Sequence, residues 1–114
     1  MISVLRPDLD VRSRRVSHLL RARGCGVGDH VAVLLENRLE YFEVAWGGLR
    51  AGLRVTPINW HLSADEARYV VEDCGARVLV ASSTLGDVVA GVDVAGLAVG
   101  GPIAGFDRYE DERD

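Results

Sequence analysis

The feature that most constrains this chain is a regular alternation of short apolar runs with stretches of helical periodicity. Residues 31–35 form a continuous, β-branched apolar run, which is typical of a strand buried on both faces. Residues 53–58 and 77–81 are further strand candidates, with Pro57 near the end of the first of them, and residues 97–99 form a shorter run. Strands that alternate with helices at this spacing predict parallel strands joined by right-handed crossovers. We therefore expect an α/β fold in which alternating helix–strand repeats form a small parallel sheet.

Helices are expected around these runs, over residues 7–23, 39–52, 64–74 and 84–91. The third has the most specific signals, because Ser63 and Glu66 have the spacing of a capping box and Gly75 supplies a stop. Asn37 is expected to cap the second helix. A turn and a polar, acidic tail follow the last apolar run. We therefore divide the chain into residues 1–101 and a linker-like segment, residues 102–114.

The aromatic residues stand at positions that indicate packing. Phe42, Trp46 and Leu49 recur at helical spacing within the second expected helix. Trp46 and Trp60 are most simply interpreted as core or interface residues. A ligand-stacking role for Trp60 has no support in the residues around it.

Composition and charge exclude several classes of function. At 114 residues the chain is one domain at most, or a part of a larger one. Its net charge of −4 provides no basic excess to neutralise the phosphates of a nucleic acid. No apolar run approaches the roughly 20 residues of a transmembrane helix, and residues 1–5 are too short for a signal peptide. We expect no nucleic-acid partner, no transmembrane segment and a cytoplasmic location.

The cysteines and the absence of lysine exclude further kinds of site. Cys25 and Cys74 are interpreted as small, partly buried apolar residues of a protein from a reducing compartment, with a disulfide as the alternative. Two cysteines without nearby histidines do not form a zinc site. All thirteen basic residues are arginine. A Schiff-base lysine and the lysine of a nucleotide-binding loop are therefore absent from this sequence.

Two motifs resemble nucleotide sites but lack a required part. Gly24, Gly26 and Gly28 follow a helix and lead into a strand, which reverses the order needed for dinucleotide binding. They are interpreted as a helix stop and a tight turn. Residues 82–86, Ser-Ser-Thr-Leu-Gly, follow a strand as a phosphate loop does, but the second glycine and the lysine are missing. Helix capping by Ser83 or Thr84 explains this segment.

Histidines and acids complete the set of candidates. His61 and Asp65 have the spacing of the histidine–aspartate pair of some acyltransferases, but Asp65 also suits the first turn of a helix. His18 and His30 have no serine or cysteine partner that the sequence identifies as a nucleophile. A phosphoacceptor receiver domain needs clustered acids and a lysine, whereas Glu36 is a single acid after the first apolar run. We therefore assign no catalytic, cofactor-binding or metal-ligating residue.

Five segments stand in an order that is specific when they are taken together. Residues 8–24 cover the first expected helix and its glycine stop, residues 26–37 a glycine turn, an expected strand and an asparagine-containing loop, and residues 40–52 the second expected helix. Residues 56–63, TPINWHLS, and the helix–strand joint at residues 72–80 follow. In this order the segments resemble the N-terminal part of the adenylate-forming (AMP-binding) acyl-CoA synthetases, the family of the fatty-acid–CoA ligases.

The resemblance implies both a fold and an activity. The fold would be an incomplete part of a larger N-terminal domain. Complete members form an acyl-adenylate from ATP and a carboxylic acid, release pyrophosphate, and transfer the acyl group to coenzyme A. ATP, Mg²⁺ and coenzyme A are thus implied for the complete enzyme and none for this chain, because the family's Lys-Gly phosphate loop and C-terminal lysine lie beyond residue 114. Residues 101–111 also resemble the linker before the ATP site in fatty-acid-directed members, which suggests a medium- or long-chain fatty acid.

The leading hypothesis is that the chain is a fragment of such a ligase, truncated before the nucleotide loop and inactive alone. Its partner would be the rest of the synthetase polypeptide, in cis or in trans. Sheet edges and apolar helix faces left uncovered would then favour self-association. The alternative comes from another class: a small non-catalytic α/β module that binds a partner protein or an acyl ligand.

Overall fold

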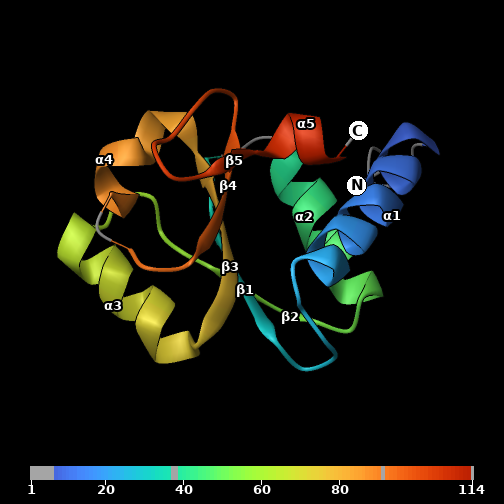
Figure 1. Ribbon diagram of the computed structural model, residues 1–114, viewed down its shortest axis with the longest axis horizontal. Coiled ribbons are helices and arrows are strands. Elements are labelled where there is room, and N and C mark those ends of the chain that lie inside the picture. Colours follow the sequence, from blue (N-terminus) through green and yellow to red (C-terminus); the bar gives the residue numbers. More distant parts are fainter. Residues whose placement is uncertain (1–6, 37–38, 91, 114) are drawn as a thin grey trace.

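The computed structural model describes residues 7–36, 39–90 and 92–113, which form a five-stranded sheet with helices on both faces (Figure 1). All neighbouring strands in the sheet are parallel. In chain order the elements are α1 (Pro7–Ala22), β1 (His30–Leu34), α2 (Leu39–Arg50), β2 (Arg54–Pro57), α3 (Ala64–Cys74), β3 (Ala76–Ser82), the 3-10 turn η2 (Ser83–Leu85), α4 (Gly86–Val89), β4 (Ala95–Val99), β5 (Asp107–Arg108) and α5 (Tyr109–Arg113).

The predicted α/β fold with parallel strands is confirmed. The four expected strands correspond to β1, β2, β3 and β4, and the helix expected at residues 84–91 is η2 followed by the short α4. Asn37, the predicted cap of α2, lies outside the described residues. The sequence did not indicate β5 or α5, because the residues after Val99 contain no apolar run.

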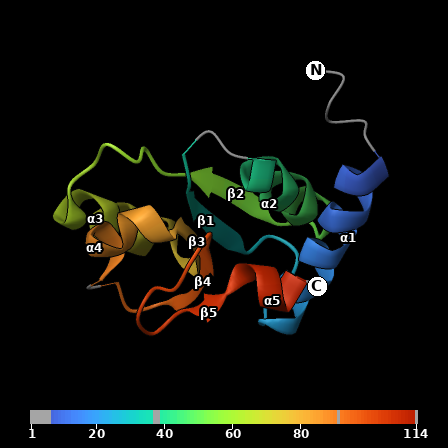
Figure 2. The ribbon, with the colours of Figure 1, turned by 90° about the horizontal axis from the view of Figure 1, so that it is seen from above.

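The strand order across the sheet is β2-β1-β3-β4-β5. From β1 the chain moves outward to β2, then crosses over β1 to β3 and continues in that direction to β4 and β5. The connections therefore reverse at the boundary between β1 and β3. Helices α1, α2 and α5 cover one face of the sheet, and α3 and α4 cover the other (Figures 1 and 2).

The central strands are buried on both faces, as their continuous apolar sequences predict. In β1, Val31 and Val33 pack toward α1 and α2, whereas Ala32 and Leu34 pack toward α3 and α4. β3 alternates in the same way, since successive side chains of a strand point to opposite faces. Two cores, one under each helical layer, therefore stabilise one sheet.

Residues 102–113 fold back onto the sheet. β5 pairs in parallel with β4, and Tyr109, at the start of α5, is fully buried in the core beneath α1 and α2. Phe106 packs against the other core, where its ring lies over Gly96 of β4. The segment expected to be a polar linker thus supplies an aromatic side chain to each core.

Helix α3 begins with the capping box that its sequence predicts. The Ser63 hydroxyl accepts a hydrogen bond from the Glu66 backbone N–H, and the Glu66 carboxylate accepts one from the Ser63 backbone N–H. This second bond holds the pKa of Glu66 below its usual range. A lowered folded pKa means that the contribution of Glu66 is complete above the ordinary glutamate pKa, about 4.3, and is lost as the pH falls through the folded value. At the other end Gly75 has a φ of 67°, the left-handed conformation that a glycine adopts readily.

We expect Ser63→Ala to lower the free energy of unfolding by about 1 kcal/mol, because one N–H group of the first turn of α3 loses its side-chain acceptor. Urea unfolding followed by far-ultraviolet circular dichroism measures the change. Ser63→Thr is the matched control, because threonine also caps helices and should cost clearly less. Equal losses for the two variants would contradict the role of the hydroxyl.

Candidate functional site

The carboxyl edge of the sheet between β1 and β3 is the place where a fold of this topology presents a ligand site. Open parallel sheets bind ligands outside the carboxyl ends of the strands, where the direction of the connections reverses. Here Leu34 of β1 is aligned with Ala81 of β3, so the residues that follow both strands meet. The Thr84 hydroxyl donates a hydrogen bond to the carboxylate of Glu36 and bridges the two strand ends.

A cavity of about 370 Å³ lies beside this edge. It is formed by η2, α4 and the segment after β4, and its lining residues are Ser83, Thr84, Gly86, Asp87, Ala90, Pro102, Ile103 and Ala104. Asp87 is the charged residue of this lining, and the nearby Glu36, bound to Thr84, is also acidic. Among the described residues, the charged group that a phosphate would meet in this cavity is the carboxylate of Asp87, which repels it.

The segment that resembles a phosphate loop acts as a helix cap. The Ser82 hydroxyl accepts a hydrogen bond from the Thr84 backbone N–H, with 3.4 Å between nitrogen and oxygen. The cap is thus Ser82 and not the predicted Ser83 or Thr84. Gly86 has a helical φ of −55°, so this glycine does not form the open turn that a phosphate cradle requires.

The other sequence candidates are separate from this edge. Gly24 and Gly28 have φ of 91° and 89° and form the turn between α1 and β1, before the amino end of that strand, as predicted. His61 and Asp65 are both exposed. The His61 ring lies 3.8 Å from that of Trp60 between centroids, whereas the Asp65 carboxylate faces Arg68 at 3.9 Å. These contacts do not assemble a general base.

Cysteines and acids within the described ranges do not form a metal centre. Cys25 and Cys74 are free, which agrees with their interpretation as small, partly buried residues, and burial raises the pKa of the Cys25 thiol. Among the residues that the structure describes, no group of three or more His, Cys, Asp or Glu side chains could hold an ion. In the same part of the chain no helix is long and apolar enough to cross a membrane.

A buried carboxylate, which sequence reasoning missed, lies on the opposite face of the sheet. Glu43 of α2 is fully buried, and one of its oxygens accepts a hydrogen bond from the Tyr109 hydroxyl at 2.8 Å. The other lies 3.2 Å from the Arg12 guanidinium of α1. Glu43 therefore joins α1, α2 and α5. The sequence did contain one sign of this burial. Glu43 lies on the same side of α2 as Val44 and Gly47, which are also buried.

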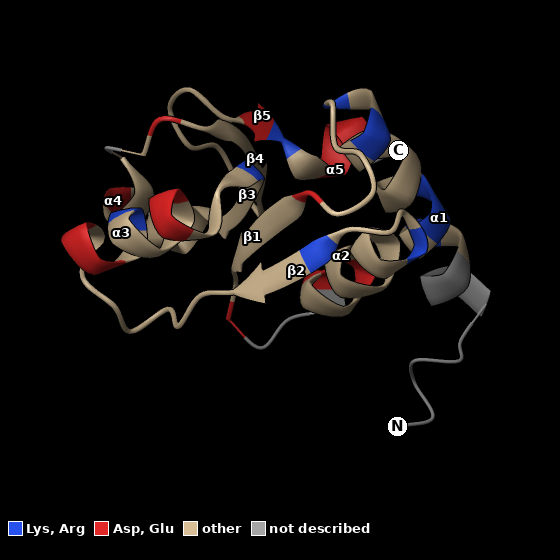
Figure 3. Ribbon diagram, turned by 90° about the horizontal axis from the view of Figure 1, so that it is seen from below, with Lys and Arg blue, Asp and Glu red and all other residues tan. Residues whose placement is uncertain are grey.

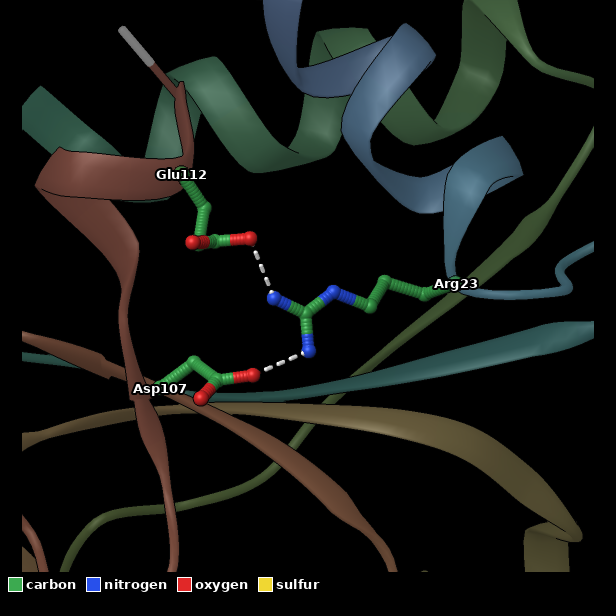
Figure 4. A network of polar contacts seen from close by, with 3 residues as sticks. All are labelled: Arg23, Asp107 and Glu112. Carbon is green, nitrogen blue, oxygen red and sulfur yellow. Dashed lines mark hydrogen bonds and ion pairs between the residues drawn. The ribbon is translucent and has the colours of Figure 1, made fainter.

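A second ionic group holds the C-terminal segment to the end of α1. Arg23 binds Asp107 of β5 and Glu112 of α5 through two different nitrogens (Figure 4). The hydrogen bond to Asp107 is the main cause of a raised pKa of the Arg23 guanidinium. All three side chains remain partly exposed, so the network positions this segment but stabilises it only weakly.

The outer side of α2 carries an apolar stripe, which we define as Phe42, Trp46 and Leu49. These side chains are 43%, 43% and 60% exposed. Trp46 is therefore not a core residue in this chain, and Trp60 is not one either, since it is 40% exposed. For both tryptophans the interface interpretation remains.

Comparisons with known proteins identify relatives of the chain. Residues 7–104 match the family model described as "AMP-binding enzyme". The fatty acid–[acyl-carrier-protein] ligase ScoC of Streptomyces coeruleorubidus is 35% identical over 82 residues, which cover 72% of this chain and 16% of that protein. The feruloyl-CoA synthase of an Amycolatopsis species is 35% identical over 105 residues, which cover 92% of this chain and 21% of that enzyme.

A solved structure from Rhodopseudomonas palustris CGA009, described as a long-chain fatty-acid–CoA ligase, has the same fold over most of the chain. The TM-score is 0.85 and the identity is 32%, with 92% of this chain and 28% of that chain covered. The chain thus spans only 16% to 28% of the length of these relatives.

Proposed function

Because the chain belongs to the family of AMP-binding enzymes, we propose that it forms the first part of the N-terminal domain of an ATP-dependent acid–CoA ligase. In this role it supplies a folded framework to the ligase and does not carry out adenylation by itself. Its partner is the rest of the ligase polypeptide, in cis or in trans. The observation that carries the proposal is the match over residues 7–104.

The chemistry of the reaction supports the proposal that the chain does not carry out adenylation by itself. Adenylation brings a carboxylate against the negatively charged α-phosphate of ATP, so the site must provide positive charge, Mg²⁺ and backbone donors aimed at the transition state. The sequence contains no lysine. The cavity beside this edge, formed by η2, α4 and the segment after β4, is lined by one carboxylate and by no arginine among the described residues. ATP, Mg²⁺ and coenzyme A therefore belong to parts of the ligase other than these residues.

The carboxylic acid that the ligase activates is inferred from the C-terminal segment of this chain. The named relatives act on a fatty acid and on ferulate, which share only the carboxylate. The likeness of residues 101–111 to the linker of fatty-acid-directed members favours a medium- or long-chain fatty acid, so fatty acids of this length are the first acids to test.

The test is a chimera in which this chain replaces the segment of the Amycolatopsis feruloyl-CoA synthase that aligns with it. We expect the chimera to form AMP in a ferulate-dependent manner. The purified 114-residue chain alone should release no pyrophosphate above background with ferulate or with fatty acids, because it cannot neutralise the phosphates. The unmodified synthase is the positive control. A folded, monomeric chimera without activity, or genuine turnover by the isolated chain, would overturn the proposal.

A further inference from the structure

We propose that the apolar stripe of α2 (Phe42, Trp46 and Leu49) is the surface on which the remaining polypeptide of the ligase packs, through apolar side chains of its own. This inference rests on the proposed function and adds the place of contact to it.

The distribution of residue sizes around α2 is the first argument. The side of α2 that faces the sheet and α1 carries Gly47 and Gly48 beside the buried Glu43 and Val44, and the buried Ala51 follows the end of the helix. A Cβ added at Gly47 or Gly48 would lie under 3.0 Å from side-chain atoms of the protein. The large apolar residues lie on the outer side, where they are 43–60% exposed. A helix that is apolar on both sides is typical of a buried helix rather than a surface helix. α2 therefore has the composition of a helix between two layers.

Charge is the second argument. The acid in the middle of α2, Glu43, is directed inward, and Glu40 and Arg50 stand in its first and last turns. By contrast, the solvent side of α1 carries the exposed arginines Arg14, Arg15 and Arg21. After Glu43, residues 44–49 of α2 carry no charge, whereas Figure 3 shows charged positions along α1 and α3. Contiguous apolar surface of this kind marks a contact site.

Phe42 of the stripe packs against a neighbouring aromatic ring. The ring of Tyr41 contacts that of Phe42 edge-on, with 5.9 Å between the centroids and an interplanar angle of 82°. Aromatic side chains bury large areas at contacts, and tryptophan is prominent among residues that dominate interfaces. The stripe thus has the features of the centre of an interface.

The length of the relatives indicates which polypeptide covers the apolar stripe. The aligned segment makes up 16% of the Streptomyces coeruleorubidus ligase and 21% of the Amycolatopsis synthase, so about four-fifths of each protein lies outside the fold described above. A polypeptide of that size, joined to this segment, provides the covering layer that α2 lacks.

Thiol labelling tests the contact independently of activity. Leu49→Cys is introduced into a Cys74→Ser background, both in the isolated chain and in the chimera with the feruloyl-CoA synthase, and maleimide modification is followed by peptide mass spectrometry. We expect Leu49→Cys to react at least tenfold more slowly in the chimera than in the isolated chain. Tyr69→Cys is the matched control. Tyr69 is 68% exposed on α3, on the other face of the sheet, and should react equally in both proteins.

The outcomes separate this inference from the proposed function. Equal labelling of Leu49→Cys in both proteins overturns the docking surface, even if the chimera is active. Protection of Tyr69→Cys to the same degree also overturns it, because the shielding would then not be specific to α2. Protection in the isolated chain that rises with its concentration would identify a second copy as the occupant and equally overturn it. An inactive chimera with Leu49→Cys selectively protected would leave the contact standing and refute the proposed function.

Discussion

Tyr109→Ala is expected to lower the free energy of unfolding by about 3–5 kcal/mol, the usual cost of truncating a fully buried aromatic side chain. Tyr109 is completely buried and packs with α1, α2 and the central strands. The substitution removes this packing and takes a hydrogen-bond donor from the buried Glu43. Since small domains are stable by only about 5–15 kcal/mol, the loss is a large part of the total. Urea unfolding followed by circular dichroism measures it.

Tyr109→Phe separates the ring from the hydroxyl. Phenylalanine keeps the packing but leaves one Glu43 oxygen without the Tyr109 hydroxyl, so we expect an intermediate loss of about 1.5–3 kcal/mol, typical of a hydrogen bond to a charged group. A change below about 1 kcal/mol for Tyr109→Ala would contradict the burial of this residue. It would instead indicate that residues 102–113 are a linker, as their polar composition first suggested.

Gly47→Ala is expected to destabilise the fold by about 2–3 kcal/mol, because the site has no space for a methyl group. A Cβ at this position would lie 2.7 Å from Cβ and Cγ1 of Val16 and 2.8 Å from the Ser13 carbonyl oxygen. The Ser13 oxygen belongs to the backbone of α1, so the two helices would have to separate. In an exposed helix the same substitution would stabilise by about 1 kcal/mol, and the sign of the effect is therefore diagnostic.

Gly86→Ala is the matched control for Gly47→Ala. Gly86 also has helical backbone angles, but the nearest atoms to an added Cβ are Ile103 Cγ1 and Cγ2, at 3.7 and 3.9 Å, which is ordinary van der Waals contact. We expect no loss of stability at Gly86. Thermal or urea unfolding of the two variants beside the wild-type chain measures both effects. A neutral Gly47→Ala would show that α1 and α2 are less closely packed than described.

The local elements were predictable because their signals are short-range. The strands β1 and β3 are marked by continuous apolar runs, and α3 by a capping box and a left-handed glycine, all within a few residues of one another. α5 was not predictable in this way. Its position depends on Tyr109 meeting Glu43, 66 residues earlier, and on Arg23 meeting Asp107, 84 residues later. Nothing in the local sequence of residues 102–113 marks either contact.

The candidate site was predictable mainly in what it excludes. The missing lysine and the reversed glycine order argued against nucleotide binding, and that exclusion remains a prediction. The periodicity of Phe42, Trp46 and Leu49 also indicated a helix correctly. It could not indicate which side of that helix faces the sheet, because a period of 3.6 residues defines a stripe but not its partner.

By itself, the sequence determined the order of the elements, the parallel character of the sheet and the family to which the chain is similar. These properties depend on local patterns and on their succession along the chain. Only the tertiary structure decided that α2 packs through its glycines and presents its large apolar side chains outward. The physical reason is steric: Val16 and Val55 leave no room for a larger residue at Gly47 and Gly48. The close approach of α2 to its neighbours therefore leaves the apolar stripe uncovered.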